Sequence, residues 1–173
     1  MKQIRRGVFE TNSSSTHAIN IYCANQYNVP KSFNVRPGEF GWENETYYYP
    51  EDKVSYLYTL ILKKCVSYVY NEVTESYENR YDYEKLTSYQ KRIKDALKDA
   101  GVEEVSFTDY ADSSYYYVDH SENITEDDID NILDNWFDDF VFNPDSVIIT
   151  GNDNCDIDVS EDSNAAFSLY KGN

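Results

Sequence analysis

Short stretches of alternating apolar and polar residues predict the strands of this protein. Residues 18–22 show the period of two most clearly, because Ile19 and Ile21 flank a polar residue. Residues 3–9 predict an earlier strand, and the wholly polar residues 10–17 would connect the two. Four further short strands are predicted at residues 102–107, 114–118, 147–150 and 167–170.

Apolar residues at helical spacing predict three helices. The first begins at Pro50 and extends to about Val69, and its apolar character on most sides predicts a central position in the core. The second spans residues 87–100 and is stopped by the following glycine. The third is capped by Thr125 and ends at the pair Asn143-Pro144.

These elements predict one α+β domain, in which a mostly antiparallel sheet packs with about three helices. Residues 23–50 contain several prolines and glycines and predict a long irregular segment. The chain then divides into a basic N-terminal hairpin (1–22), this long loop (23–50), a helical middle (51–100) and an acidic C-terminal half (101–173).

Charge is distributed unevenly along the chain, whose formal net charge is −17. Residues 1–36 carry a net +4, residues 37–100 a net −3 and residues 101–173 a net −18. A protein of this charge repels nucleic acid at long range, so direct nucleic-acid binding is not expected. The asymmetry instead favours a basic protein partner.

Cysteine use and hydropathy predict a cytoplasmic protein. Cys23, Cys65 and Cys155 are odd in number and widely spaced, so we expect free and mostly buried thiols instead of disulfides or a zinc site. No apolar run reaches the roughly 18–20 residues that span a bilayer. No apolar segment of the kind found in signal peptides follows the charged N-terminus.

The third predicted helix carries a stripe of acidic residues at four-residue steps. The stripe and its flanking residues are Glu126, Asp127, Asp128, Asp130, Asp134, Asp138 and Asp139. Repulsion along the stripe and near the helix end should cost about 1–3 kcal/mol, so asparagine substitutions are expected to be neutral or stabilising. Carboxylates about 6 Å apart resemble the phosphates of nucleic acid, which predicts a DNA-mimicking surface for a basic groove. A solvated face and cation binding are the alternatives.

The polar segment before the second predicted strand contains residue types found in nucleophilic active sites. Its residues are Glu10, Thr11, Asn12, Ser13, Ser14, Ser15, Thr16 and His17. A serine activated by His17 and oriented by Glu10 would form a triad, but no Gly-x-Ser-x-Gly elbow surrounds these serines. Such hydroxyls commonly bond their own backbone, so structural or partner-binding use is predicted and no catalytic residue is assigned.

Two groups of residues raise the hypothesis of a metal site. His17, Asp119 and His120 would suffice for zinc or iron if they met in space, which the sequence does not establish. Residues 152–158 resemble a calcium loop, but the glycine and the glutamate that such a loop requires are missing. No metal and no cofactor are therefore predicted.

The N-terminal string from Ile4 to His17, IRRGVFETNSSSTH, resembles the start of a family of small phage- and mobile-element-encoded proteins from Firmicutes. Residues 39–43 and 56–59 fit the same pattern, which extends over about the first third of the chain. In its small size and acidity the chain is also similar to anti-CRISPR proteins, in particular to inhibitors of the type II effector Cas9. That similarity rests on the overall profile and not on a motif, so it transfers no functional residue.

The sequence therefore predicts a phage-encoded inhibitor of a nucleic-acid-binding defence protein of the bacterial host, with Cas9 as the candidate partner. Its partner-binding residues would be Glu126, Asp127, Asp130, Asp134, Asp138 and Asp139. Tyrosines are expected to add contact area, namely Tyr47, Tyr48, Tyr115 and Tyr116. The alternatives are a small enzyme that uses residues 10–17 and a phage structural or assembly protein.

Overall fold

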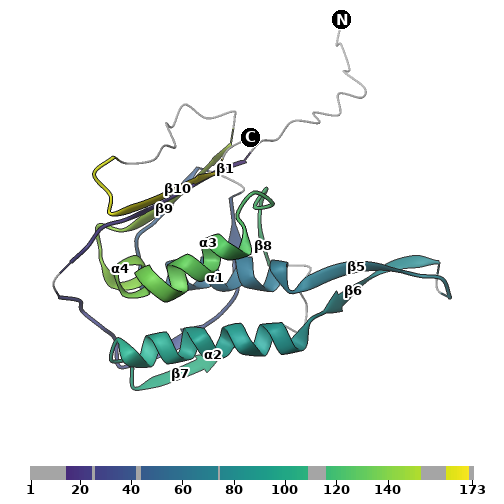
Figure 1. Cartoon of the computed structure of the whole chain (residues 1–173), viewed down its shortest axis with the longest axis horizontal. Coiled ribbons are helices and arrows are strands. Elements are labelled where there is room, and N and C mark those ends of the chain that lie inside the picture. The colour runs from purple at the N-terminus through teal and green to yellow at the C-terminus, as the bar shows by residue number, and fades with distance from the viewer. Residues whose placement is uncertain are drawn as a thin grey trace, which may run out of the picture.

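The computed structural model describes residues 15–24, 26–41, 44–73, 75–108, 116–152 and 163–171, and Figure 1 shows how their elements are arranged. The strand predicted at residues 3–9, residues 10–14 of the polar segment and most of the calcium-like loop lie outside the described residues. Within the described ranges, no helix has the length and apolar character that crossing a membrane requires.

A four-stranded antiparallel sheet, in the order β10-β1-β9-β4, forms the upper layer in Figure 1. Its strands are β1 (Ser15–Ile21), β4 (Glu45–Tyr47), β9 (Val147–Asn152) and β10 (Phe167–Lys171). Ile19 lies opposite Ile148 and Leu169 in the two neighbouring strands, and all three side chains are buried. The alternation around Ile19 predicted a half-buried strand, but Ala18 and Asn20 on the other face are buried as well, so β1 is enclosed on both faces, and both of its edges are occupied by β9 and β10.

Helix α1 (Pro50–Lys64) crosses the centre of the molecule, as predicted. Pro50 lies in its first turn, where the missing N–H costs nothing, and the acidic residues that follow suit the positive end of the helix dipole. Every residue from Lys53 to Leu62 is buried. The prediction that this helix continues to Val69 is wrong, because the helix ends at Lys64 and a strand follows.

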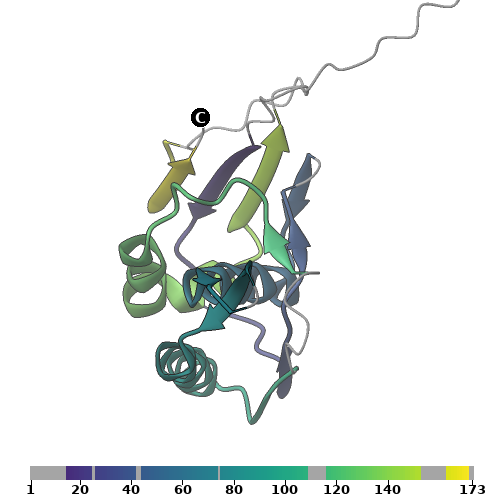
Figure 2. The ribbon, with the colours of Figure 1, turned by 90° about the vertical axis from the view of Figure 1, so that its right-hand side faces the viewer.

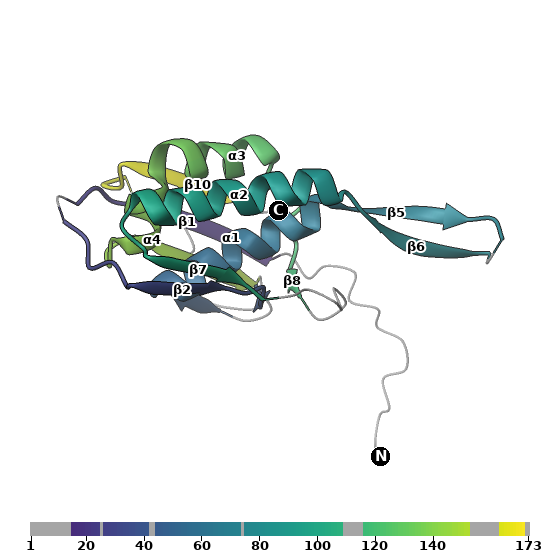
Figure 3. The same ribbon diagram turned by 90° about the horizontal axis from the view of Figure 1, so that it is seen from below.

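Strands β5 (Val66–Asn71) and β6 (Ser76–Tyr81) form a separate two-stranded antiparallel ribbon. The ribbon projects away from the helices and the sheet in Figures 1 and 3. Its apolar residues also fit a helical period, which explains the error in the predicted end of α1. The β-branched and aromatic residues of β5 favour a strand once the helix has ended.

Residues 23–50 are not irregular throughout, in contrast to the prediction, because they contain β2 (Ser32–Val35), β3 (Glu39–Phe40) and β4. Strand β2 pairs in parallel with β7 (Glu104–Phe107), and β3 pairs in parallel with β8 (Tyr117–Val118). The partner strands lie far along the chain, so local pattern could not reveal these pairs. Apart from them the sheets are antiparallel, and the predicted α+β arrangement is confirmed.

Helix α2 (Tyr83–Asp99) begins earlier than predicted, because Asp82 caps it. The Asp82 carboxylate accepts a hydrogen bond from the backbone N–H of Lys85 at 3.0 Å. Gly101 follows the last turn with a φ of 110°, which is a conformation that glycine adopts without strain. The stop predicted for this helix is thus confirmed.

The third helix consists of α3 (Glu126–Asn131), a π-helical turn η2 (Ile132–Trp136) and α4 (Phe137–Phe142). Its predicted start is confirmed, because Thr125 and Asp128 form a reciprocal capping box. Its predicted end before Asn143 is also confirmed. The π-helical turn was not predicted; such turns accommodate one additional residue and are frequent at functional sites.

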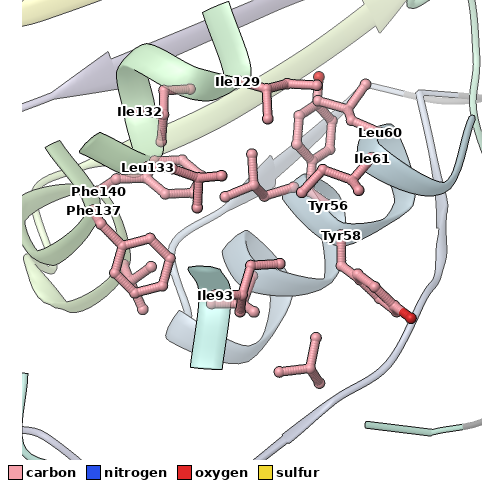
Figure 4. Packing of buried hydrophobic residues seen from close by; sticks show 14 of the residues in the cluster. Tyr56, Tyr58, Leu60, Ile61, Ile93, Ile129, Ile132, Leu133, Phe137 and Phe140 are labelled. Carbon is pink, nitrogen blue, oxygen red and sulfur yellow. The ribbon is translucent and has the colours of Figure 1, made fainter. Parts of the chain in front are cut away.

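The helices share one apolar core beneath the sheet. Figure 2 shows α1 between the sheet and α2, and Figure 4 shows buried side chains of α1, α2 and the third helix in mutual contact. Tyr56 and Ile61 come from α1, Ile93 comes from α2, and Leu133 and Phe140 come from the third helix. This packing leaves the acidic face of the third helix beside α2 and solvent.

Candidate partner-binding site

Helix α2 lies alongside the third helix (Figure 3) and pairs with most of the predicted acidic stripe. The Lys85 ammonium contacts the Glu126 carboxylate at 2.6 Å. Arg92 bridges two stripe residues, with N–O distances of 2.5 Å to Asp130 and 2.7 Å to Asp134. These contacts run from the start of both helices toward their ends, so the helices are parallel. Most of the stripe is therefore neutralised within the molecule, which the sequence did not predict.

Asp130 is held by more than the charge of Arg92. The Tyr89 hydroxyl donates to the same carboxylate oxygen at 3.0 Å, and the Arg92 guanidinium lies 5.2 Å from the centre of the Tyr89 ring. A charge-assisted pair supported by a second donor is stronger than an isolated surface ion pair. These contacts oppose the expectation that asparagine would be tolerated throughout the stripe.

Asp138, the last residue of the stripe, has a different environment. Helix α2 carries Lys85, Arg92 and Asp99 at seven-residue intervals, so Asp99 occupies the position where a third cation would follow. Burial raises the pKa of the Asp138 carboxyl, and the charges of Asp139 and Asp99 raise it further. No cation among the described residues contacts Asp138. Among the described residues, this end of the stripe therefore has no ion-pair partner.

Asp99 and Asp138 line an open hollow of about 360 Å³ between the end of α2 and the π-helical turn. The hollow is lined by Tyr27, Ala96, Asp99, Leu133, Asp134, Asn135, Trp136, Phe137, Asp138 and Asp139. The half-buried Trp136 ring stacks on Phe167 of β10, with ring centres 5.9 Å apart. We call this feature the acidic hollow. Carboxylates next to an aromatic ring suit a lysine or arginine side chain, because ring faces attract cations.

Asp139 has a structural role in addition to its charge. Its carboxylate accepts a hydrogen bond from the Tyr27 hydroxyl at 2.5 Å and another from the backbone N–H of Ala24 at 2.9 Å. Burial raises the pKa of the Tyr27 hydroxyl, and its bond to Asp139 adds to the shift. Asp139 therefore attaches the segment after β1 to the third helix.

The two remaining acids of the first turn differ from each other. Asp128 forms the capping box with Thr125 and also contacts the Lys171 ammonium at 3.3 Å. Burial opposes ionisation of Asp128, but the hydrogen bonds from Thr125 and Lys171 outweigh it and lower the pKa. Asp127 is exposed and has no partner in the described part of the chain. Of these two residues, only Asp127 is free to meet a partner.

The structure corrects the prediction that residues 15–17 belong to a loop. Ser15, Thr16 and His17 lie in β1, where they pair with residues of β9. The His17 side chain is 1% exposed and therefore belongs to the core. The preceding residues of the polar segment, 10–14, lie outside the described residues.

Both ring nitrogens of His17 have close partners. Nδ1 lies 3.0 Å from the Tyr56 hydroxyl, and Nε2 lies 2.5 Å from the carbonyl oxygen of Asp119. Burial lowers the pKa of His17. At Gly41 a Cβ atom would lie 2.9 Å from His17 Cε1, and its φ of 90° also favours glycine. His17 is thus packed as a core residue, and neither ring nitrogen is available as a base for a serine.

The three residues of the hypothetical metal site meet only in part. His17 contacts the Asp119 carbonyl, and His120 Nδ1 lies 3.2 Å from the Asp119 carboxylate. Within the described ranges, no group of three or more His, Cys, Asp or Glu side chains could hold a metal ion. These residues instead hold the start of β1 against the turn after β8.

The described cysteines carry free thiols. Cys65 is buried, as predicted, whereas Cys23 is exposed, so the prediction of burial is wrong for Cys23. Cys155 lies outside the described residues.

The tyrosines predicted to add contact area occupy different environments. Tyr48 is 52% exposed, whereas Tyr47 is half-buried and its hydroxyl bonds to Glu45. Tyr116 is half-buried, and Tyr115 lies outside the described residues. Tyr48 is therefore the member of this group best placed to reach a partner.

Sequence reasoning missed Asp99, Tyr27 and Trp136 as residues of the acidic hollow. Asp99 had a detectable signal, because residues seven apart lie on one face of a helix and would have grouped it with Lys85 and Arg92. Tyr27 and Trp136 had none, because their positions depend on the π-helical turn and on contacts between distant segments.

Comparison of the chain with protein-family models, with curated proteins and with solved structures found no match. The relationship to phage proteins that the N-terminal string suggests therefore stays a prediction. The case for a function rests on the residues of the acidic hollow and on the charge of the chain.

Proposed function

We propose that this protein is an inhibitor that binds the basic nucleic-acid channel of a host defence protein, in the manner of anti-CRISPR proteins that act on Cas9. The acidic hollow is the centre of the interface in this proposal. Lysine or arginine side chains that normally hold phosphates in the channel would enter the hollow and pair with Asp99 and Asp138. The phage origin in this proposal rests on the resemblance of the N-terminal string alone.

The observation that carries the proposal is that Asp99 and Asp138 lie near each other with no ion-pair partner among the described residues. Helix α2 supplies cations to Glu126, Asp130 and Asp134, but it presents Asp99 toward Asp138. Like charges that raise the pKa of Asp138 are unfavourable in the free protein. A cation from a partner would relieve this repulsion, so the arrangement favours binding over stability.

The binding surface is narrower than the set of six partner-binding residues predicted from the sequence. Arg92 and Lys85 already neutralise part of that stripe, so Glu126, Asp130 and Asp134 present less charge to a partner. We place the interface on Asp99, Asp138 and the Trp136 side of the hollow. Exposed Asp127 would extend it toward the start of the helix.

Substitution of Asp99 by lysine tests this proposal. The new cation would complete the series begun by Lys85 and Arg92, would attract Asp138, and would suit the negative end of α2. We expect the thermal midpoint to stay the same or rise. Binding to purified guide-free Cas9, measured by fluorescence anisotropy, should weaken at least tenfold, since about 1.4 kcal/mol suffices for that change.

Asp95→Lys is the matched control, because it makes the same charge change on α2 outside the hollow. Among the described residues, the ion-pair partner of Asp95 is the exposed Lys91 of its own helix. We expect this variant to bind much as wild type does. Equal losses in the two variants would mean that net charge, and not the hollow, governs binding. Failure of the wild-type protein to bind or inhibit the nuclease would refute this choice of partner.

A further inference from the structure

The β5–β6 ribbon is the part of the molecule that the acidic hollow leaves unexplained. Within the described part of the chain it consists of two strands, and neither has a second neighbour there. Its base is attached to the body by a hydrogen bond from Asp82 N to Cys65 O at 2.8 Å. An isolated two-stranded ribbon gains little stability in water, and its open edges are a liability for a soluble protein. We therefore expect the ribbon to have a function other than stabilising the core.

The ribbon carries apolar side chains where a partner can reach them. Val73, in the turn between the strands, is 92% exposed, the highest value among the exposed large apolar residues of the described chain. Tyr70 is 50% exposed and Val69 is 41% exposed. Val69 and Tyr70 are consecutive in β5 and so face opposite sides of the ribbon, and Val73 lies at its tip, so the ribbon offers apolar contacts on both faces and at its end.

Side-chain hydrogen bonds of Asn71 link the described residues on the two sides of the tip. Asn71 accepts a hydrogen bond from Val73 N at 2.9 Å and donates one to the Glu78 carboxylate at 2.8 Å. The bond from Val73 N ties this residue to the end of strand β5, and a contact that is held in place before binding loses less conformational entropy on binding.

Charge indicates which kind of partner fits the ribbon. Glu72, Glu75 and Glu78 surround the apolar tip, and Arg80 is the single cation of strand β6. A second copy of this chain, with a net charge of −17, would repel this acidic tip. A basic protein surface attracts it.

We propose that the β5–β6 ribbon is an insertion arm that enters a basic cleft of the protein partner. In this assignment Val73 contacts an apolar site inside the cleft, and Glu72 and Glu75 pair with lysine or arginine side chains along its walls. The assignment rests on the proposed function, because it places the arm in the same channel that the acidic hollow covers. The two features would act as separate contacts on one partner.

Binding of arm variants to guide-free Cas9 tests the assignment. The variants are Val73→Ser, which removes the apolar tip, and the double variant Glu72→Lys/Glu75→Lys, which reverses its charge. The control is Glu104→Lys/Asp145→Lys, which makes the same charge change at exposed positions of the body. Each arm variant should bind at least tenfold more weakly than wild type, while the control stays within about threefold. The thermal midpoint of the arm variants should be unchanged, because Val73 lies outside the core.

The outcomes separate this inference from the proposed function. If the arm variants bind as wild type does while Asp99→Lys binds more weakly, the role of the ribbon as an insertion arm is refuted but the proposed function is not. A wild-type protein that does not bind the nuclease would overturn both. A wild-type dimer that Val73→Ser converts to monomer in sedimentation would show that a second copy, and not a basic protein, occupies the arm.

Discussion

Lys53 is the most unusual residue of the core. Its side chain is fully buried, and its ammonium donates to the carbonyl oxygens of Asn143 and Ser146 at 2.9 Å and 3.0 Å. Burial lowers its pKa to about 8. The Ser146 hydroxyl in turn accepts a hydrogen bond from the backbone of Tyr22. Lys53 therefore holds the turn between α4 and β9, and through it the end of β1, against α1.

Replacement of Lys53 by methionine should destabilise the protein despite the greater hydrophobicity of methionine. The two carbonyl oxygens would lose their lysine donor inside the core, and such a loss typically costs about 1–3 kcal/mol. Urea unfolding measures the change directly. Lys91→Met, at an exposed position, is the control and should change the free energy of unfolding by less than about 0.5 kcal/mol. Equal stability of Lys53→Met and wild type would show that the turn does not depend on the ammonium.

Stability should fall as the pH falls below neutrality, because His17 is buried as a neutral ring. Burial lowers the pKa of His17 in the folded protein, so below the ordinary pKa of about 6.5 the unfolded chain binds more protons. This one group can remove at most about 1.4 kcal/mol of stability per pH unit. We expect the free energy of unfolding, measured with urea, to fall steadily between about pH 7 and pH 5.5.

The variant His17→Gln is the control for this pH dependence. It is expected to be less stable than wild type at every pH, because it loses packing and the two contacts of the ring. The slope of its free energy of unfolding against pH should nevertheless be smaller, since the titrating histidine is absent. Parallel slopes for the two proteins would assign the pH dependence to other residues.

At the scale of the element, the ion pairs between α2 and the third helix leave less negative charge on the acidic stripe than the sequence suggests. Residues on the third helix repel one another in isolation, but Lys85 and Arg92 on the neighbouring helix offset this repulsion. The π-helical turn ends at Trp136, whose ring stacks on Phe167 and forms one wall of the hollow. Ion pairs with α2 therefore hold the first part of the third helix, whereas Asp138, near its end, has no ion-pair partner among the described residues.

Two single substitutions should separate these halves. Asp130→Asn removes the charge that holds Arg92, so we expect a loss of about 1 kcal/mol in urea unfolding. Asp138→Asn removes a like charge without losing a cation, so stability should stay the same or rise by up to about 0.5 kcal/mol. The sequence alone predicted no loss at either position. A stable Asp130→Asn variant would mean that the contacts of Arg92 and Tyr89 add nothing measurable.

At the scale of the whole molecule, negative charge is concentrated in the C-terminal half of the chain, while the positive charges of α2 are partly used in pairing. The acidic hollow lies at the end of α2, and the ribbon extends from the start of the same helix (Figure 1). A partner that contacts both features must span the length of α2. In the proposed function, the basic channel must therefore be at least as long as helix α2.

Affinity for a basic partner should depend strongly on salt. The Debye length falls from about 10 Å at 0.1 M salt to about 3 Å at 1 M, which screens exposed charges. We expect at least a tenfold loss in affinity for guide-free Cas9 between about 0.05 M and 0.5 M salt. Circular dichroism at both salt concentrations is the control that the fold is intact. A constant affinity over this range would contradict an electrostatic interface.

The sequence by itself determined the features that depend on neighbouring residues. Pro50 and Thr125 mark helix starts, and Gly101 marks a helix end, because caps and left-handed turns are satisfied by atoms a few residues away. The alternation around Ile19 likewise predicted a strand, but not that β1 would be buried on both faces. The buried character of α1 also followed from composition, since a helix that is apolar on most sides must be surrounded.

Only the tertiary structure decided which charges are free and which strands pair. Asp130 and Asp138 have the same local sequence environment of acidic neighbours, yet Arg92 lies beside one and Asp99 beside the other. The sequence predicts His17 to be a loop residue, but Tyr56 and the Asp119 carbonyl, both distant in sequence, contact its ring in the core. Strands β2 and β3 need partners from beyond α2. Contacts between segments far apart in the chain depend on how helices and strands pack, and local periodicity carries no record of that packing.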